Sequence, residues 1–119
     1  MKKRSNRICI IGAGFAGRSI AAEIRAKGIL GEVALFLDDD PEKIGTFMDG
    51  IPVLGPIADV ERVLEGHPAD EALIAVPSAT REWLRSTYAI LKRAEFAKIR
   101  LLPGLSQIIE GDAHLIQTR

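Results

Sequence analysis

The chain has 119 residues, 16 of them basic and 16 acidic, so its formal net charge is zero. Hydrophobic residues make up 47% and charged residues 27%, which is the composition of a folded protein and not of a disordered one. This length corresponds to one domain and excludes a complete two-domain dehydrogenase, which needs a substrate domain beside its cofactor domain. The balanced charge argues against a general nucleic-acid binder, which carries a basic excess.

The single cysteine and the chain start say little about function. Cys9 excludes an intrachain disulfide, and its place in an apolar run predicts a buried, inert thiol. No apolar run reaches the roughly 18–20 residues that a membrane-spanning helix needs. The basic residues 1–6 are not followed by a signal-peptide core, so we interpret them as a tail or linker.

Short apolar runs alternate along the chain with helical patterns. A β-branched run predicts a buried strand at Arg7–Ile11. Apolar residues spaced four apart then predict a helix over Phe15–Lys27, which Gly28 ends. A second strand is expected over Glu32–Leu37, because a run of aspartates and a proline follows it.

The second half of the chain continues this alternation. Pro52 weakens a short third strand over Gly50–Leu54 and favours an edge position for it. The remaining expected elements are a helix at Asp59–Glu65, a strand at Glu71–Val76, a helix at about Ala79–Glu95 and a strand at Lys98–Leu102.

This order of elements predicts an α/β fold. Strands joined through helices favour right-handed crossovers and a parallel sheet with helices on both faces. The simplest arrangement is a Rossmann-like, doubly wound sheet of five parallel strands in the order 3-2-1-4-5, whose crevice lies beyond the carboxyl ends of the first and fourth strands. We assign residues 7–111 to this domain and residues 112–119 to the start of a linker or strand.

The junction between the first strand and helix carries the string GAGFAG. A GxGxxG string alone is a weak signal, but here it follows a strand, opens a helix and precedes an acid by about 20 residues. Gly12 permits a tight turn, Gly14 lets a pyrophosphate approach, and Gly17 lets the helix pack closely. The helix start, with Phe15 and Ala16, offers amides to phosphates. Glycines kept for packing alone are the competing interpretation.

Three acids follow the second strand. Asp38 stands where a carboxylate accepts hydrogen bonds from an adenosine ribose. Together with Asp39 and Asp40 it would repel the ribose phosphate of NADP or coenzyme A, so NAD, or another nucleotide without that phosphate, fits better. For Asp39 and Asp40 a solvated turn is the plainer interpretation. A carboxylate also accepts the uracil N–H, which makes a UDP-sugar the alternative ligand.

The fourth strand brings Val76, Pro77 and Ser78 to the same crevice. We expect Pro77 and Ser78 to line the nucleotide site, where the Ser78 hydroxyl contacts a ribose or phosphate, caps the next helix, or does both.

No catalytic residue and no metal ligand is predicted. Tyr88 and Lys92 match the YxxxK pair of short-chain dehydrogenases, but the pair stands too early in the chain and Tyr88 falls on the apolar stripe of its helix. The two histidines, His67 and His114, are far apart and no cysteine accompanies them.

Four longer strings carry a family resemblance: RICIIGAGFAGRSIAAEI, FLDDDPEKIGTFMDGIPVLG, DEALIAVPSATREWLR and IRLLPGLSQIIEG. In this order they resemble the cytoplasmic Rossmann-like, coenzyme-A-binding-like domain of bacterial polysaccharide-biosynthesis proteins. These are membrane-associated nucleoside-diphosphate-sugar 4,6-dehydratases and epimerases of the CapD type. The resemblance implies a non-catalytic nucleotide-binding module, with the three glycines at the phosphates and Asp38 at a ribose or base.

The same resemblance implies partners outside this chain. In such proteins the domain stands between membrane helices and a catalytic short-chain-dehydrogenase domain, at the inner face of the cytoplasmic membrane, and a homo-oligomer fits this setting. The apolar run at Ala113–Thr118 agrees with a chain taken from a longer protein.

Two other families share parts of the pattern. The middle of the chain is similar to NADH-sensing Rex repressors, which need a winged-helix DNA-binding domain that the six residues before Arg7 cannot form. The FLDDD and PVLG strings resemble the N-terminal domain of sugar acetyltransferases that bind UDP-amino sugars. Three functions remain open: a module that binds NAD or a UDP-sugar, a stand-alone NAD-dependent oxidoreductase completed by oligomerisation, and a vestigial domain with a structural role.

Overall fold

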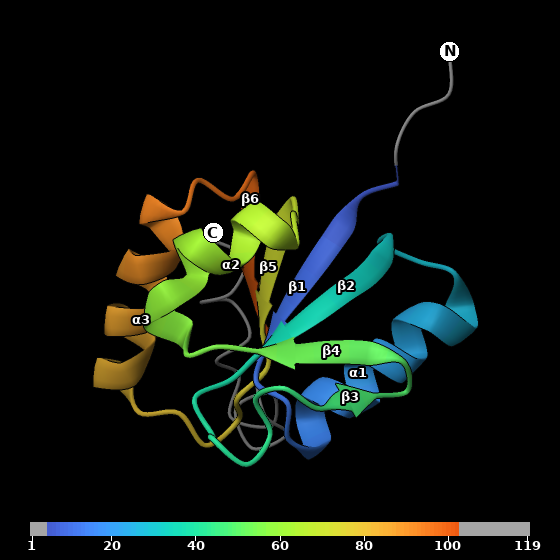
Figure 1. Ribbon diagram of the computed structural model, residues 1–119, viewed down its shortest axis with the longest axis horizontal. Helices are drawn as coiled ribbons and strands as arrows, with labels where there is room; N and C mark the ends of the chain where they lie inside the picture. Colours follow the sequence, from blue (N-terminus) through green and yellow to red (C-terminus); the bar gives the residue numbers. More distant parts are fainter. Residues whose placement is uncertain (1–4, 103–119) are drawn as a thin grey trace, which may run out of the picture.

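Six strands and three helices make up the part of the chain that the computed structural model describes, residues 5–102 (Figure 1). The strands are β1 (Arg7–Ile11), β2 (Glu32–Leu37), β3 (Phe47–Met48), β4 (Ile51–Leu54), β5 (Glu71–Ile74) and β6 (Lys98–Leu101). The helices are α1 (Phe15–Lys27), α2 (Val60–Gly66) and α3 (Arg81–Arg93), with a 3-10 turn, η1 (Ile57–Asp59), before α2. The expectations for residues 1–4 and 103–119 lie outside the described residues.

The sheet has the strand order β3-β4-β2-β1-β5-β6, and all pairs except β3–β4 are parallel. The predicted α/β class and the order of the five parallel strands are confirmed, but the prediction of a five-stranded, wholly parallel sheet is wrong. The extra strand, β3, has only two residues and reaches β4 through a tight turn in which Asp49 and Gly50 both have positive φ angles. Such a short strand has no periodicity to detect.

The edge position expected for Pro52 is also wrong, since β3 covers β4 and Phe47 pairs with Pro52. The predicted bounds of β1, α1 and β2 are confirmed. The last helix begins later than expected, at Arg81, and its N-cap is Thr80, whose hydroxyl accepts a hydrogen bond from the Trp83 amide at 3.0 Å. Ser78 therefore does not cap α3.

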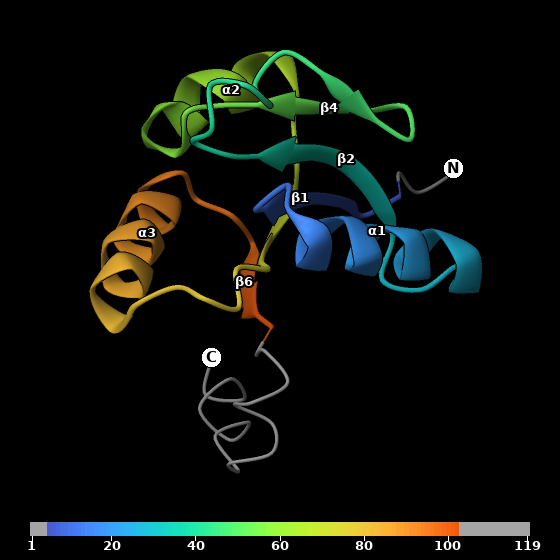
Figure 2. The ribbon, with the colours of Figure 1, turned by 90° about the horizontal axis from the view of Figure 1, so that it is seen from below.

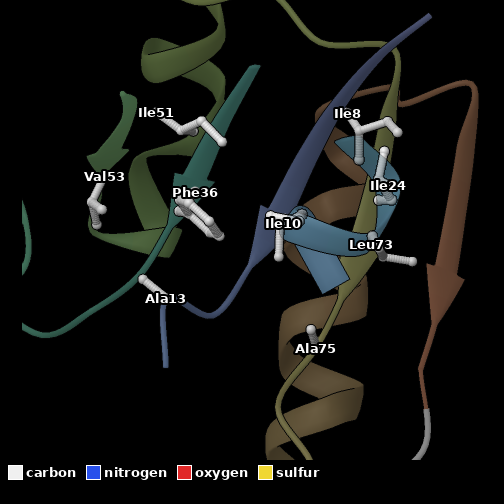
Figure 3. Packing of buried hydrophobic residues seen from close by; sticks show 10 residues of the cluster. Ile8, Ile10, Ala13, Ile24, Phe36, Ile51, Val53, Leu73 and Ala75 are labelled. Carbon is white, nitrogen blue, oxygen red and sulfur yellow. The ribbon is translucent and has the colours of Figure 1, made fainter. Parts of the chain in front are cut away.

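Two cores lie on opposite faces of the sheet, because successive side chains of a strand point to opposite sides. Ile8 and Ile10 of β1 pack with Ile24 of α1 on one face (Figure 3). Cys9 and Ile11 pack on the other face, with α2 and α3. Figure 2 shows α1 and α3 on opposite sides of the strands, which is the doubly wound arrangement that the sequence predicts.

Cys9 is fully buried, as predicted, and burial raises the pKa of its thiol well above the usual range. Tyr88 is not a core residue, because 43% of it is exposed and the buried positions of α3 are Thr87 and Leu91. The stripe passes through Thr87, three residues after Leu84, and not through Tyr88, four residues after it. No helix within residues 5–102 is long and apolar enough to cross a membrane.

Candidate nucleotide-binding site

A cleft of about 390 Å³ opens at the carboxyl ends of β1, β2 and β5, where the doubly wound topology predicts a crevice. Its volume lies in the range of small-molecule sites, about 300–1,000 Å³. The residues that line it are Gly12, Gly14, Phe15, Ala16, Asp38, Lys43, Ala75, Val76, Pro77 and Ser78. The structure thus brings together seven of the nine residues predicted for the site, all except Gly17 and Asp39.

Gly12 forms the tight turn that leaves β1. Its φ of +109° suits glycine, and its amide donates a hydrogen bond to the Leu37 carbonyl at 2.8 Å. A Cβ at this position would lie 2.8 Å from Val76 Cγ2 and 3.0 Å from the Ala75 carbonyl oxygen. Because Gly12 has no side chain, the turn after β1 can lie close to Ala75 and Val76, the residues that follow β5.

The two later glycines of the loop have different surroundings. A Cβ on Gly17 would overlap the Gly12 carbonyl oxygen, so Gly17 serves the close packing of α1 and does not line the cleft. A Cβ on Gly14 would meet nothing within 4 Å. The space beside Gly14 opens into the cleft, which agrees with its predicted role of admitting a ligand.

The start of α1 faces this space without a side-chain cap. Gly14 is the N-cap and has no side chain to bond the first amides, and the first turn contains no acid. Helix starts leave backbone N–H groups unpaired and carry a partial positive charge, so they attract anions. Phe15, in this first turn, is 79% exposed, the most of the large apolar residues described, and it forms part of the cleft wall.

Asp38 is tied to the glycine loop. One carboxylate oxygen accepts the Ala13 amide at 2.7 Å and the other accepts the Asp40 amide at 2.8 Å. A carboxylate has about four acceptor sites, so each oxygen keeps one for a ligand. Asp38 thus positions the loop and still presents acceptors to the cleft.

The two following acids are used by the backbone. Asp39 accepts the Ile57 amide at 2.8 Å and Asp40 accepts the Glu42 amide at 2.9 Å. Neither residue lines the cleft, so the structure separates Asp39 from the other predicted site residues. The turn interpretation thus describes the bond of Asp40 to Glu42, whereas Asp39 bonds a residue 18 positions further along the chain.

Sequence reasoning missed two lining residues, Lys43 and Ala75, and it brought Val76 to the crevice without counting it among the site residues. β5 ends at Ile74, two residues before the predicted end of this strand, and Ala75 and Val76 follow it along the cleft. Lys43 lies in the turn after β2, and its five-residue distance from Asp38 was the one available signal. Ser78 is exposed, and because Thr80 is the N-cap of α3, the Ser78 hydroxyl does not cap this helix.

The cleft contains no recognisable acid–base pair. Tyr88 and Lys92 do not line it; the Lys92 ammonium lies 6.0 Å from the centre of the Tyr88 ring on α3. Among residues 5–102, no group of three or more His, Cys, Asp or Glu could hold a metal ion.

Residues 3–82 match the model of a family described as the CoA binding domain. The chain belongs to this family. A solved structure of UDP-D-quinovosamine 4-dehydrogenase from Vibrio fischeri shares the fold with a TM-score of 0.76 and 30% identity, over 90% of this chain and 85% of that one. The Rossmann-like, CoA-binding-like assignment is therefore confirmed, while the narrower CapD-type assignment stays a prediction.

Rex repressors are also similar to this CoA-binding-domain chain. The redox-sensing repressor Rex of Roseiflexus sp. (strain RS-1) is 30% identical over 110 residues, which are 87% of this chain and 46% of the repressor. The Rex of Desulfitobacterium hafniense is 32% identical over 60% of this chain and 33% of the repressor. The chain thus spans less than half of these curated relatives. RSP, a Rex-family repressor solved in complex with β-NADH, shares the fold with a TM-score of 0.68 at 20% identity, over 86% of this chain and 47% of that one.

Proposed function

We propose that the chain binds a nucleotide in the cleft between the glycine loop and the end of β5. NAD(H) is the first candidate ligand and a UDP-sugar is the second. The observation that carries this proposal is the uncapped start of α1 beside Gly14, in a cleft whose loop is held by Asp38. Unpaired amides suit a diphosphate, and the remaining acceptors of Asp38 suit hydroxyl groups.

NAD(H) is favoured over NADP and coenzyme A on charge. Both of the latter carry a phosphate on the adenosine ribose, which would face the Asp38 carboxylate. Only Asp38 contributes this repulsion inside the cleft, because Asp39 and Asp40 bond backbone amides elsewhere. The relative RSP is known in complexes with β-NADH and β-NAD+, which supports a nicotinamide dinucleotide.

The UDP-sugar alternative has its own support. The dehydrogenase from Vibrio fischeri, whose name includes a UDP-sugar, matches most of this chain at 30% identity. A carboxylate such as Asp38 accepts the N–H of uracil as well as ribose hydroxyls. The same likeness supports a further alternative, in which the chain is part of a sugar-nucleotide oxidoreductase. The catalytic groups of that enzyme would come from outside residues 5–102 or from a second subunit.

The setting we propose is that of a binding module in a larger enzyme. A nucleotide site without an acid–base pair in the described cleft fits the nucleotide-binding part of a bacterial polysaccharide-biosynthesis dehydratase or epimerase. Its partners would then be a catalytic short-chain-dehydrogenase domain and membrane helices, on the cytoplasmic side of the membrane.

Ligand titration tests the proposal. Melting temperature and binding heat are measured with NAD, NADP, coenzyme A and UDP-N-acetylglucosamine, and a ligand at 100 times its Kd adds about 2.7 kcal/mol to stability. We expect a shift with NAD or the UDP-sugar. No shift with any of the four ligands would leave only a structural role, and preference for NADP or coenzyme A would contradict the role of Asp38.

A pair of valine variants locates the site. Gly14→Val fills the open space in the cleft and should abolish binding while the protein stays folded. Gly66→Val is the matched control, because a Cβ there also meets nothing within 4 Å but Gly66 ends α2 and does not line the cleft. Binding that survives Gly14→Val would refute the glycine-loop assignment.

A further inference from the structure

The turn that follows β2 is held in one conformation by a dense set of hydrogen bonds. The Asp40 carbonyl accepts the amides of Lys43 and Ile44 at 2.9 and 3.0 Å. The Lys43 carbonyl accepts both the amide and the hydroxyl of Thr46, at 3.0 and 2.7 Å. The backbone at Lys43 is therefore fixed, so the direction in which its side chain leaves the chain is set before any ligand binds.

This turn changes the charge that the cleft presents. Asp39 and Asp40 point their carboxylates at backbone amides, whereas the half-buried Lys43 lines the cleft. Within residues 5–102 the Lys43 ammonium has no carboxylate within ion-pair distance. The acid-rich turn thus gives the cleft one acid, Asp38, and one unpaired cation.

The strand order places this cation beside the glycine loop. Because β1 lies between β2 and β5, the loop after β1 occupies the middle of the cleft, with Lys43 on the β2 side and Ser78 on the β5 side. Lys43 thus lines the cleft on the β2 side of the loop that leads into α1. An ammonium that gains an ionised partner makes a stronger hydrogen bond than one between neutral groups.

We propose that Lys43 is a phosphate-binding residue of the cleft and contacts the diphosphate of the bound nucleotide. This inference rests on the proposed function and extends it, since it names the side chain that adds a full positive charge to the partial charge of the α1 start. The contact between Lys43 and the diphosphate makes the site selective for nucleoside diphosphate derivatives over nucleosides.

The test uses Lys43→Gln and Lys43→Arg with Lys98→Gln as control. Lys98 is an exposed lysine at the amino end of β6, opposite the cleft, so its loss changes the net charge equally. Calorimetric Kd values are measured for NAD, NADP and UDP-N-acetylglucosamine at low and high salt.

For each diphosphate ligand that the wild type binds, we expect Lys43→Gln to weaken binding about five- to twentyfold and to flatten its salt dependence. Lys43→Arg should restore most of the affinity, and Lys98→Gln should change neither quantity.

Each outcome has one meaning. If the wild type binds no nucleotide, the proposed function itself fails. If it binds and Lys43→Gln matches Lys98→Gln, the nucleotide site stands and Lys43 has no part in it. Loss of affinity with unchanged salt dependence, or loss for NADP alone, would place Lys43 at the nucleoside end or at a ribose phosphate and overturn the diphosphate contact. The melting temperature of Lys43→Gln should equal that of the wild type, because the ammonium has no ion-pair partner to lose.

Discussion

Replacement of Asp38 by asparagine tests how the acid after β2 holds the glycine loop. Asp38 is the one acid of the run whose two oxygens each accept a backbone amide, from Ala13 and from Asp40. Asparagine has a single carbonyl oxygen, and its NH2 group cannot accept a hydrogen bond. One amide therefore loses its partner and faces another donor. Asp40 is half-buried and Ala13 is completely buried, so water replaces a lost bond only in part at Asp40 and not at Ala13.

The expected cost follows from this geometry. A buried donor left without a partner costs about 1–3 kcal/mol. For a chain of this length each kcal/mol lowers Tm by about 3–6 °C, so Asp38→Asn should melt about 3–18 °C below the wild type. Circular dichroism or differential scanning calorimetry measures the shift.

Asp39→Asn and Asp40→Asn are the matched controls. Each of these acids uses one oxygen, for the amide of Ile57 or of Glu42, and the asparagine carbonyl can take over a single bond. Both variants should therefore melt within about 3 °C of the wild type. If Asp38→Asn melts no lower than these two, the two-amide role of Asp38 is refuted.

Three more predictions concern packing, capping and the thiol. Gly17→Ala places a methyl group against the Gly12 carbonyl oxygen and should cost about 3 kcal/mol or more, read from urea unfolding. Thr80→Ala removes the α3 cap and should cost about 1 kcal/mol, whereas Ser78→Ala should leave stability unchanged; equal effects would contradict the cap assignment. The Cys9 thiol, whose pKa burial raises, should stay protonated and unreactive to Ellman's reagent at pH 8 in the native state and react on unfolding, since it is fully buried.

Prediction from the sequence succeeded where a pattern depends on local chemistry. The β-branched run at Arg7–Ile11 and the helix ended by Gly28 each combine periodicity with a clear stop, and the structure has the same bounds. The order of the parallel strands follows from handedness and from the position of the glycine loop. The bounds of β1 and α1 need no knowledge of distant contacts.

Prediction failed where the role of a residue depends on the path of the backbone. Ser78 and Thr80 both have a hydroxyl suited to capping α3, and only the backbone path decides that Thr80 reaches the Trp83 amide. The role of Asp39 depends on Ile57, which lies 18 residues away. Lys43 belongs to a turn whose direction is set by hydrogen bonds that no residue pattern reveals.

The double use of Asp38 bears on which ligand the cleft accepts. Both carboxylate oxygens are already engaged by amides, so each can offer one further acceptor site to a ligand. A ribose with two free hydroxyls supplies two donors to those sites and leaves the glycine loop in place. A ribose phosphate removes one donor and sets a charge against the carboxylate, whose movement away would break its bonds to the Ala13 and Asp40 amides. The proposed preference for NAD would therefore have its origin in the loop as well as in charge. Lys43, on the same side of the cleft, would not remove this conflict, because it has no ion pair with Asp38 that would neutralise the acid.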